Sequence, residues 1–195
     1  MILRMTTVFL LSLFLQNLVL NSGFGMETII RAGQKPSRLW RVSVLLTLFS
    51  ILATLLGWPV HQLLRFERTD IRARLLIFIV IVCLLYAAAV WLHRRVVRSS
   101  KRPLFTTAEL MTAAFNNIVA VIPYYASQTA LDLGDSLLLA VYAGLGFLLA
   151  SWFYSGSAFL LHSEKLPAAF RGAPAKLLYI GILFLAFAGF SGAAP

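Results

Sequence analysis

The chain contains very few of the residues from which catalytic and metal sites are usually built. It has one cysteine, Cys83, among 195 residues, so it cannot by itself supply the four thiolates of an iron–sulfur cluster or of a cysteine-rich zinc site. It also lacks a nucleophile elbow, a phosphate-binding glycine loop and a dinucleotide fingerprint. These absences argue against a stand-alone enzyme, and we interpret Cys83 as a small buried apolar residue.

Histidine is equally sparse, with three residues in the chain. We expect His93 and His162 at the inner ends of membrane spans and His61 in an outer loop. No two of them have the spacing of paired metal ligands, so we expect no metal site.

Charge is scarce as well, because only 12% of residues are charged, against roughly a quarter in an ordinary soluble domain. Apolar residues make up 60%, and a membrane span needs about 20 mostly apolar residues in a row. The sequence therefore predicts an all-α integral membrane protein. Six runs qualify as spans: residues 5–20, 42–60, 75–92, 104–126, 137–161 and 177–190.

The formal net charge of +10 would suggest nucleic acid in a soluble chain, but here the basic residues lie at the ends of apolar runs and indicate orientation. With the N-terminus outside, the inner connections carry twelve of the 17 basic residues: Arg31, Lys35, Arg38, Arg41, Arg94, Arg95, Arg98, Lys101, Arg102, Lys165, Arg171 and Lys176. We predict a multi-pass inner-membrane protein with both termini outside and no nucleic-acid partner. The basic segment 93–102 also suits anionic lipid or a soluble partner domain.

Two pairs of amide side chains recur about one hundred residues apart inside apolar runs. Gln16 and Asn17 form the first pair, and Asn116 and Asn117 form the second. Each pair is followed by an aliphatic residue and then valine. Polar residues within the membrane are candidates for a transport pathway, but they also cap broken helices or join helices to each other. Both interpretations stay open.

Helix-breaking residues follow both amide pairs: Gly23 and Gly25 in the first half and Pro123 in the second. Matching interruptions in two halves are typical of inverted repeats. Three spans in each half invert the second half relative to the first. We therefore predict one domain over residues 1–195 in two inverted three-helix repeats, about 1–100 and about 101–195, each containing a broken half-helix.

Residues 106–109 have the pattern of a capping box, in which Thr106 and Glu109 cap the fourth helix. A cation relay through Glu109 toward Asn116 is the alternative, because seven residues place the two on one helix face.

Several of these residues together resemble a known family. Residues 16–20, Gly25, Asn117, residues 167–172 and residues 185–192 are similar in sequence and position to the RnfA (RsxA) component of the Rnf electron-transport complex, which is similar to the NqrE component of sodium-pumping NADH:quinone reductase. The resemblance covers nearly the whole chain. It implies a six-span inverted repeat, a sister membrane subunit, other Rnf-type subunits as partners and surrounding membrane lipid.

Family members contribute one cysteine from each half-helix to an iron or iron–sulfur centre shared with the sister subunit. In this chain those positions fall at or near Glu27 and Ile118, and neither is cysteine. We therefore expect no cofactor and no metal in this chain. Glu27 either replaces the lost thiolate as an oxygen ligand or ion site, or marks the inner end of the first span beside Arg31.

Three functions follow from these observations. The first is a non-catalytic membrane subunit of a redox-driven ion-translocating electron-transport complex, in which soluble subunits hold the cofactors. The second is a cofactor-free scaffold paralogue that keeps only the partner interface. The third is a small transporter with an asparagine-lined site at the membrane midplane.

Overall fold

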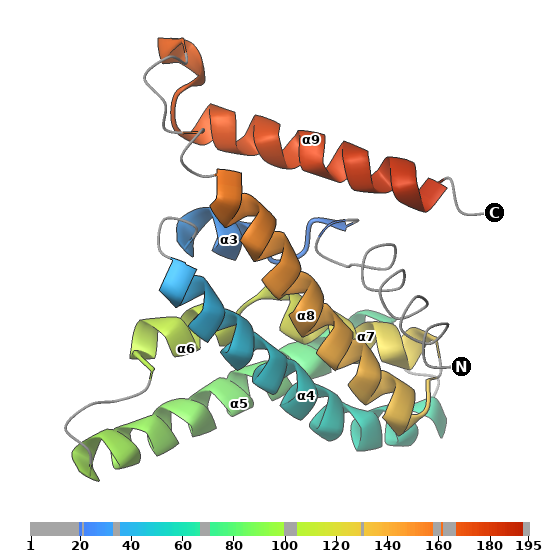
Figure 1. The fold of residues 1–195 in the computed structure, drawn as a ribbon. Helices are drawn as coiled ribbons and strands as arrows, with labels where there is room; N and C mark the ends of the chain where they lie inside the picture. The colour runs from blue at the N-terminus through green and yellow to red at the C-terminus, as the bar shows by residue number, and fades with distance from the viewer. Residues whose placement is uncertain are drawn as a thin grey trace, which may run out of the picture. The chain divides into compact units, whose positions relative to one another are not determined.

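The computed structural model describes residues 20, 22–32, 36–66, 71–99, 105–129, 131–157, 161 and 167–192. Every element in these residues is helical (Figure 1). In chain order they are α3 (Met26–Ala32), α4 (Pro36–Phe66), α5 (Ile71–Ser99), α6 (Thr107–Ala114), α7 (Asn117–Gln128), α8 (Leu133–Ser157), the 3-10 helix η2 (Ala168–Phe170) and α9 (Ala173–Gly192).

Three of these helices are long and apolar enough to cross a bilayer: Arg38–Leu63 in α4, Arg72–Arg95 in α5 and Leu133–Ser157 in α8. The prediction of an all-α membrane protein is thereby confirmed. The apolar part of α9 is shorter and covers Ala173–Phe187. The first predicted span, with Gln16 and Asn17, lies outside the described residues apart from Leu20. The six-span inverted repeat stays a prediction.

The fifth and fourth predicted runs can be compared with the helices of the structure. The fifth run was predicted at 137–161, but α8 covers Leu133–Ser157. Hydropathy placed the start of this run too late, because the first turn of α8 contains Gly134 and Asp135, which are not apolar. The helix nevertheless begins there, since a carboxylate is favourable at a helix N-terminus. The fourth run, 104–126, forms two helices, α6 and α7, as the broken half-helix predicted in the second half requires.

Backbone contacts divide the chain into two compact units. One unit comprises residues 1–39 and 145–195, and the other comprises residues 40–144, so α4 and α8 contribute to both. These units differ from the repeats predicted at about 1–100 and 101–195, whose boundaries stay a prediction.

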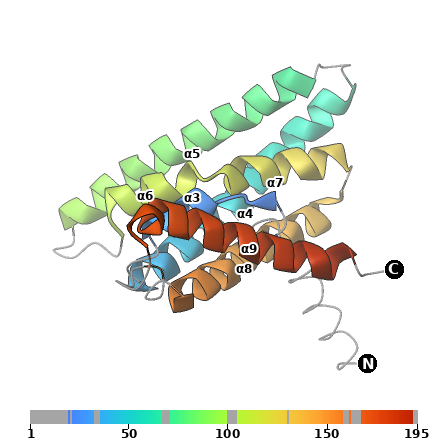
Figure 2. The same ribbon diagram turned by 90° about the horizontal axis from the view of Figure 1, so that it is seen from above.

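In unit 40–144, α5 packs along the short helices α6 and α7, as Figures 1 and 2 show. Aromatic side chains make this contact. Phe78 meets Tyr124 edge to face at 6.4 Å between ring centroids, and Tyr86 meets Phe115 at 5.0 Å. Edge-to-face pairs of this kind add about 0.5–1.5 kcal/mol beyond the area that they bury.

The same unit contains a close approach between α4 and α8 at Gly144. The Ser43 hydroxyl donates a hydrogen bond to the Gly144 carbonyl at 3.4 Å. A β-carbon on Gly144 would overlap the Thr47 side chain, including its β-carbon at 2.8 Å. Small residues at such crossings let membrane helices come near enough for hydrogen bonds between helices.

In unit 1–39 with 145–195, the C-terminal part of α8 packs against α9. The Ser157 and Tyr179 hydroxyls lie 2.7 Å apart, and Tyr179 also donates to the Phe153 carbonyl at 3.3 Å. The Phe153 ring meets Phe187 at 5.9 Å. A tyrosine hydroxyl thus satisfies its polar end inside an otherwise apolar helix contact.

From the close contact at Gly144 we predict how substitution of this glycine changes the stability of the protein. Replacing Gly144 with alanine should destabilise the protein by about 1–3 kcal/mol, the usual effect of overpacking, and thermal unfolding in detergent followed by size-exclusion chromatography measures it. Gly156→Ala on the same helix is the matched control, because its added β-carbon meets no described atom within 4 Å beyond the nearby backbone of its own helix. Adding Thr47→Ala should restore part of the loss. Equal melting temperatures for the two glycine variants would contradict the close contact.

Candidate functional site at the broken helix

The interruption of the fourth predicted span lies between α6 and α7, at Phe115 and Asn116. The Phe115 N–H still donates to the Met111 carbonyl at 3.1 Å, which closes α6. Asn116 then adopts an extended conformation, with φ −71° and ψ 135°, and its side-chain oxygen accepts from the Ile118 N–H at 3.0 Å. Asparagine is among the best N-cap residues, because it satisfies an N–H that a helix start leaves open.

Proline is not what breaks this span, contrary to the prediction. Pro123 lies inside α7 and the helix continues through it. The helix breaks at Asn116 instead, because its short side chain offers the backbone a competing hydrogen bond. Asn116 is buried, whereas Asn117 is exposed. The cap interpretation therefore describes Asn116, while Gln16 and Asn17 lie outside the described residues.

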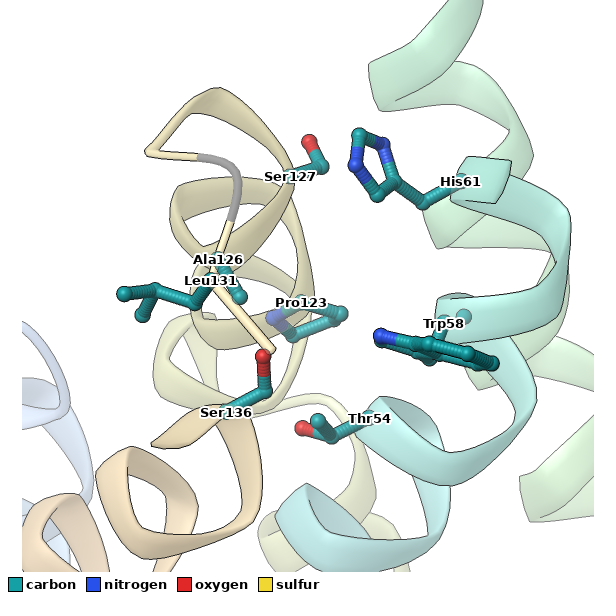
Figure 3. Close-up of a pocket in the computed structure, with 9 residues that line it drawn as sticks. Thr54, Trp58, His61, Pro123, Ala126, Ser127, Leu131 and Ser136 are labelled. Atoms are coloured by element: carbon teal, nitrogen blue, oxygen red, sulfur yellow. The ribbon is translucent and has the colours of Figure 1, made fainter. Parts of the chain in front are cut away.

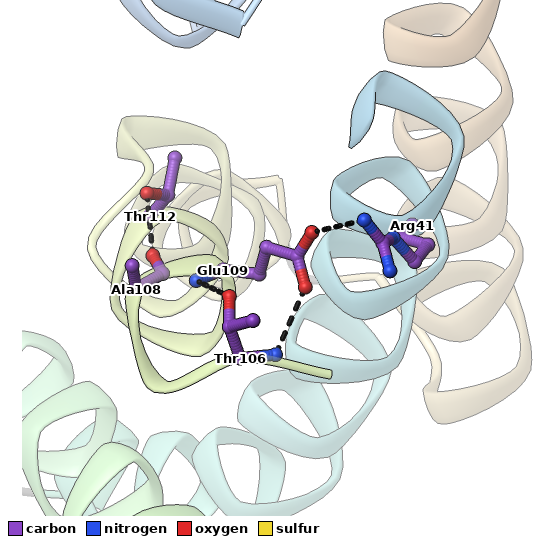
Figure 4. Close-up of polar contacts among 5 residues, drawn as sticks. All are labelled: Arg41, Thr106, Ala108, Glu109 and Thr112. Atoms are coloured by element: carbon purple, nitrogen blue, oxygen red, sulfur yellow. Dashed lines mark hydrogen bonds and ion pairs between the residues drawn. The ribbon is translucent and has the colours of Figure 1, made fainter. Parts of the chain in front are cut away.

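The start of α6 is held by Glu109 (Figure 4). The predicted capping box is present: the Thr106 N–H donates to Glu109 Oε2 at 2.9 Å, and the Glu109 N–H donates to Thr106 Oγ1 at 3.2 Å. The other carboxylate oxygen, Oε1, lies 3.0 Å from Nη2 of Arg41 on α4. Glu109 is 2% exposed, so this pairing compensates a carboxylate that the fold removes from solvent.

The predicted relay from Glu109 to Asn116 rested on a shared helix face. The break after Ala114 ends α6 between the two residues, so they do not belong to one continuous helix. Glu109 instead fixes the beginning of α6, and Asn116 fixes the beginning of α7.

Glu27 and Ile118 occupy matching places in two helices. Glu27 is the second residue of α3, and Ile118 is the second residue of α7. Each helix follows a break, since Gly23 and Gly25 before α3 have φ values of 72° and 80°, a conformation that favours glycine. Each of the two positions derived from the resemblance is therefore the second residue of a helix that follows non-helical backbone.

Their side chains do not fit the metal centre that the resemblance implies. Ile118 is fully buried and has no ligand atom. Glu27 is exposed and offers one carboxylate, which a helix N-terminus stabilises without any metal. No group of three or more histidine, cysteine, aspartate or glutamate side chains suited to a metal occurs in the part of the chain that the structure describes.

Cys83 is not buried, contrary to the prediction. It lies on the exposed side of α5, whose apolar segment Arg72–Arg95 is only 17% buried within the protein. The sequence could not indicate this, because a helix that is apolar all round gives no sign of which face meets protein.

One feature was missed by the sequence altogether. A small hollow in unit 40–144 is lined by residues of α4, α7, the α7–α8 connection and the start of α8 (Figure 3). His61 lines it from α4 and is 6% exposed, whereas we predicted it in an outer loop. The predicted apolar run ends at Val60, but the helix continues to Phe66. The only sequence signal for this hollow is the position of His61, a histidine directly after the end of a predicted span.

The fold therefore defines a class, an all-α membrane protein with a capped break between the short helices α6 and α7. No family profile matches the chain. Three relatives are similar over nearly the full length, and each is the A-type subunit of its complex. The first, from the ion-translocating oxidoreductase complex of Syntrophotalea carbinolica, is 25% identical over 94% of both chains. The second, from the Na(+)-translocating ferredoxin:NAD(+) oxidoreductase complex of Acetobacterium woodii, is 24% identical over 96% of this chain and 98% of the relative. The third, from the proton-translocating ferredoxin:NAD(+) oxidoreductase complex of Clostridium ljungdahlii, is 24% identical over 95% of both chains.

The resemblance predicted from the sequence is confirmed by these relatives. The chain is RnfA-like, and the similarity extends from end to end and is not limited to one motif.

The Arg41–Glu109 pair predicts an asymmetric effect of mutation. Arg41→Met should destabilise the protein by about 1–3 kcal/mol, because it leaves a buried carboxylate without its cation. Glu109→Gln should have a smaller effect, since glutamine still accepts the Thr106 N–H and leaves only the half-exposed arginine unpaired. The double variant should be more stable than Arg41→Met alone. Thermal unfolding of all four proteins measures this, and additive losses would argue against the pair.

The Asn116 cap predicts a second, local effect. Asn116→Ala should cost about 1 kcal/mol, the usual loss for an N-cap, whereas Asn116→Asp and Asn116→Ser should retain most of the stability. Asn117→Ala, one residue further at an exposed position, is the matched control. Hydrogen exchange at the Ile118 amide reports the cap directly. Unchanged protection of that amide in Asn116→Ala would show that the side chain does not close the helix.

Proposed function

We propose that this chain is a membrane subunit of a redox-driven ion-translocating electron-transport complex, in the position that RnfA occupies. The observation that carries the proposal is the similarity over about 95% of the chain to relatives named as that component. The broken helix formed by α6 and α7 supports it, because non-helical backbone at membrane depth is typical of ion-pathway proteins.

The names of the same relatives also support a proposal about the partners and the membrane location of this chain. They are named as subunits of oxidoreductase complexes, so we propose that this chain assembles with redox subunits that hold the cofactors and with a sister membrane subunit. We place it in a bacterial inner membrane with both termini outside. The uneven distribution of arginine and lysine over the connecting segments supports this orientation.

We further propose that this chain provides scaffold and ion-pathway surfaces but no ligand to a metal centre. Ile118 supports this, since it is fully buried at one of the two positions where the resemblance implies a cysteine. The scaffold paralogue is the second candidate function, and the same residue favours it. The transporter alternative has less support, because the described Asn116 uses its side-chain oxygen for a helix cap.

Purification of the tagged chain, co-expressed with the genes that flank its own, tests the proposal. We expect flavin- and iron-containing subunits to co-purify. We also expect iron and the visible spectrum of the complex to be unchanged by Cys83→Ala, which removes the only thiol of this chain. Loss of iron in that variant would overturn the absence of a metal ligand.

A well-folded preparation from which all redox subunits are missing would overturn membership of the complex and favour the scaffold or transporter. Arg41→Met, which weakens the α4–α6 contact but touches no thiol, controls for iron lost through poor assembly.

A further inference from the structure

The hollow in unit 40–144 lies near one end of the α4 span. Thr54, Trp58 and His61 line it from α4, Ser127 from α7 and Ser136 from the first turn of α8 (Figure 3). Thr54, Trp58 and His61 belong to the last ten residues of the apolar segment Arg38–Leu63. The hollow has room for about one molecule the size of water.

Trp58 supplies an unused donor to this space. Its indole Nε1 is buried and has no hydrogen-bond partner among the residues that the structure describes. A buried N–H without a partner costs about 1–3 kcal/mol. In Figure 3 the indole nitrogen is directed toward the interior of the hollow, on the side of Pro123 and Ser136. An occupant that accepts this hydrogen bond would remove the cost.

Three hydroxyl groups supply acceptors. Each donates its proton to a backbone carbonyl three or four residues earlier: Thr54 to Ser50 at 2.8 Å, Ser127 to Tyr124 at 2.6 Å and Ser136 to Asp132 at 2.8 Å. A hydroxyl has one proton and two lone pairs. Because the protons are already used, the hydroxyl oxygens can face the hollow only as acceptors.

The occupant must therefore accept from an indole N–H and donate to hydroxyl oxygens within the volume of one small molecule. A water molecule does both. A bare sodium ion cannot accept from an N–H, and a halide cannot donate to an oxygen. The absence of a carboxylate among the lining residues also gives a cation no charge partner.

We propose that this hollow is a binding site for one internal water molecule, which accepts from Trp58 Nε1 and donates to hydroxyl oxygens of α7 and α8. The water connects the end of α4 to the broken span at α7 and to the next helix. Internal waters commonly make about three hydrogen bonds of this kind. The inference does not depend on the proposed function, because it rests only on the donors and acceptors of these helices.

The indole N–H of Trp58 can be observed directly. The full-length protein, labelled with 15N-tryptophan in lipid nanodiscs, has four indole resonances, and Trp58→Phe assigns the relevant one. We expect a dipolar cross-peak between the Trp58 indole proton and water that persists on the timescale of slow exchange. Trp40, Trp91 and Trp152 are 58%, 59% and 73% exposed and serve as internal references at the protein surface.

Ser136→Val should abolish the cross-peak, because it removes an acceptor and fills the space with methyl groups. Thr129→Val is the matched control, since it removes an exposed hydroxyl that also bonds to its own helix but does not line the hollow. The wild-type spectrum decides the question even if a variant fails to fold.

Three results would overturn the proposal. A cross-peak from the Trp58 indole to lipid acyl protons in place of water would assign the space to lipid. A shift of its resonance with sodium chloride but not with choline chloride would assign a cation. Absence of any water cross-peak in folded protein would show that the hollow binds no water.

Discussion

A bilayer offers no hydrogen bonds to a polypeptide backbone, and the fourth of the predicted spans is nevertheless interrupted, between α6 and α7. Each backbone group that is freed at the interruption must find a partner inside the protein. The structure meets this requirement with side chains from the segment itself. Asn116 accepts the N–H of Ile118, and Thr106 and Glu109 exchange hydrogen bonds at the start of α6. The short helices α6 and α7 depend on these caps, because helices of 8 and 12 residues are marginal in isolation.

The caps also determine how the broken span is attached to its neighbours. Glu109 is at once a cap and the partner of Arg41, so the same carboxylate that begins α6 also holds it against α4. Helix α5 also packs along both short helices and makes edge-to-face aromatic contacts with Phe115 and Tyr124. The two short helices on either side of the break are in this way held by contacts with α4 and α5 within one compact unit.

Sequence reasoning found the membrane class, the capping box and the approximate place of the break, because each depends on local pattern. Long apolar runs predicted α4 and α5, and the spacing of Thr106 and Glu109 predicted their exchange of hydrogen bonds. It failed where the outcome depends on neighbours distant in sequence. Pro123 was expected to end a helix that continues through it, His61 was expected outside a helix that includes it, and Cys83 was expected to be buried. The hollow was also out of reach, since Trp58 and Ser136 come together only in the folded unit.

The outward position of Cys83 has a practical consequence. It is the only thiol in the chain and lies midway along α5, whose apolar segment is the least buried of the three long apolar segments found among the described residues. A spin label or fluorophore attached there needs no prior removal of other cysteines. Its mobility and the polarity that it senses would therefore report whether lipid or a neighbouring protein covers that face, in the native chain and without an engineered site.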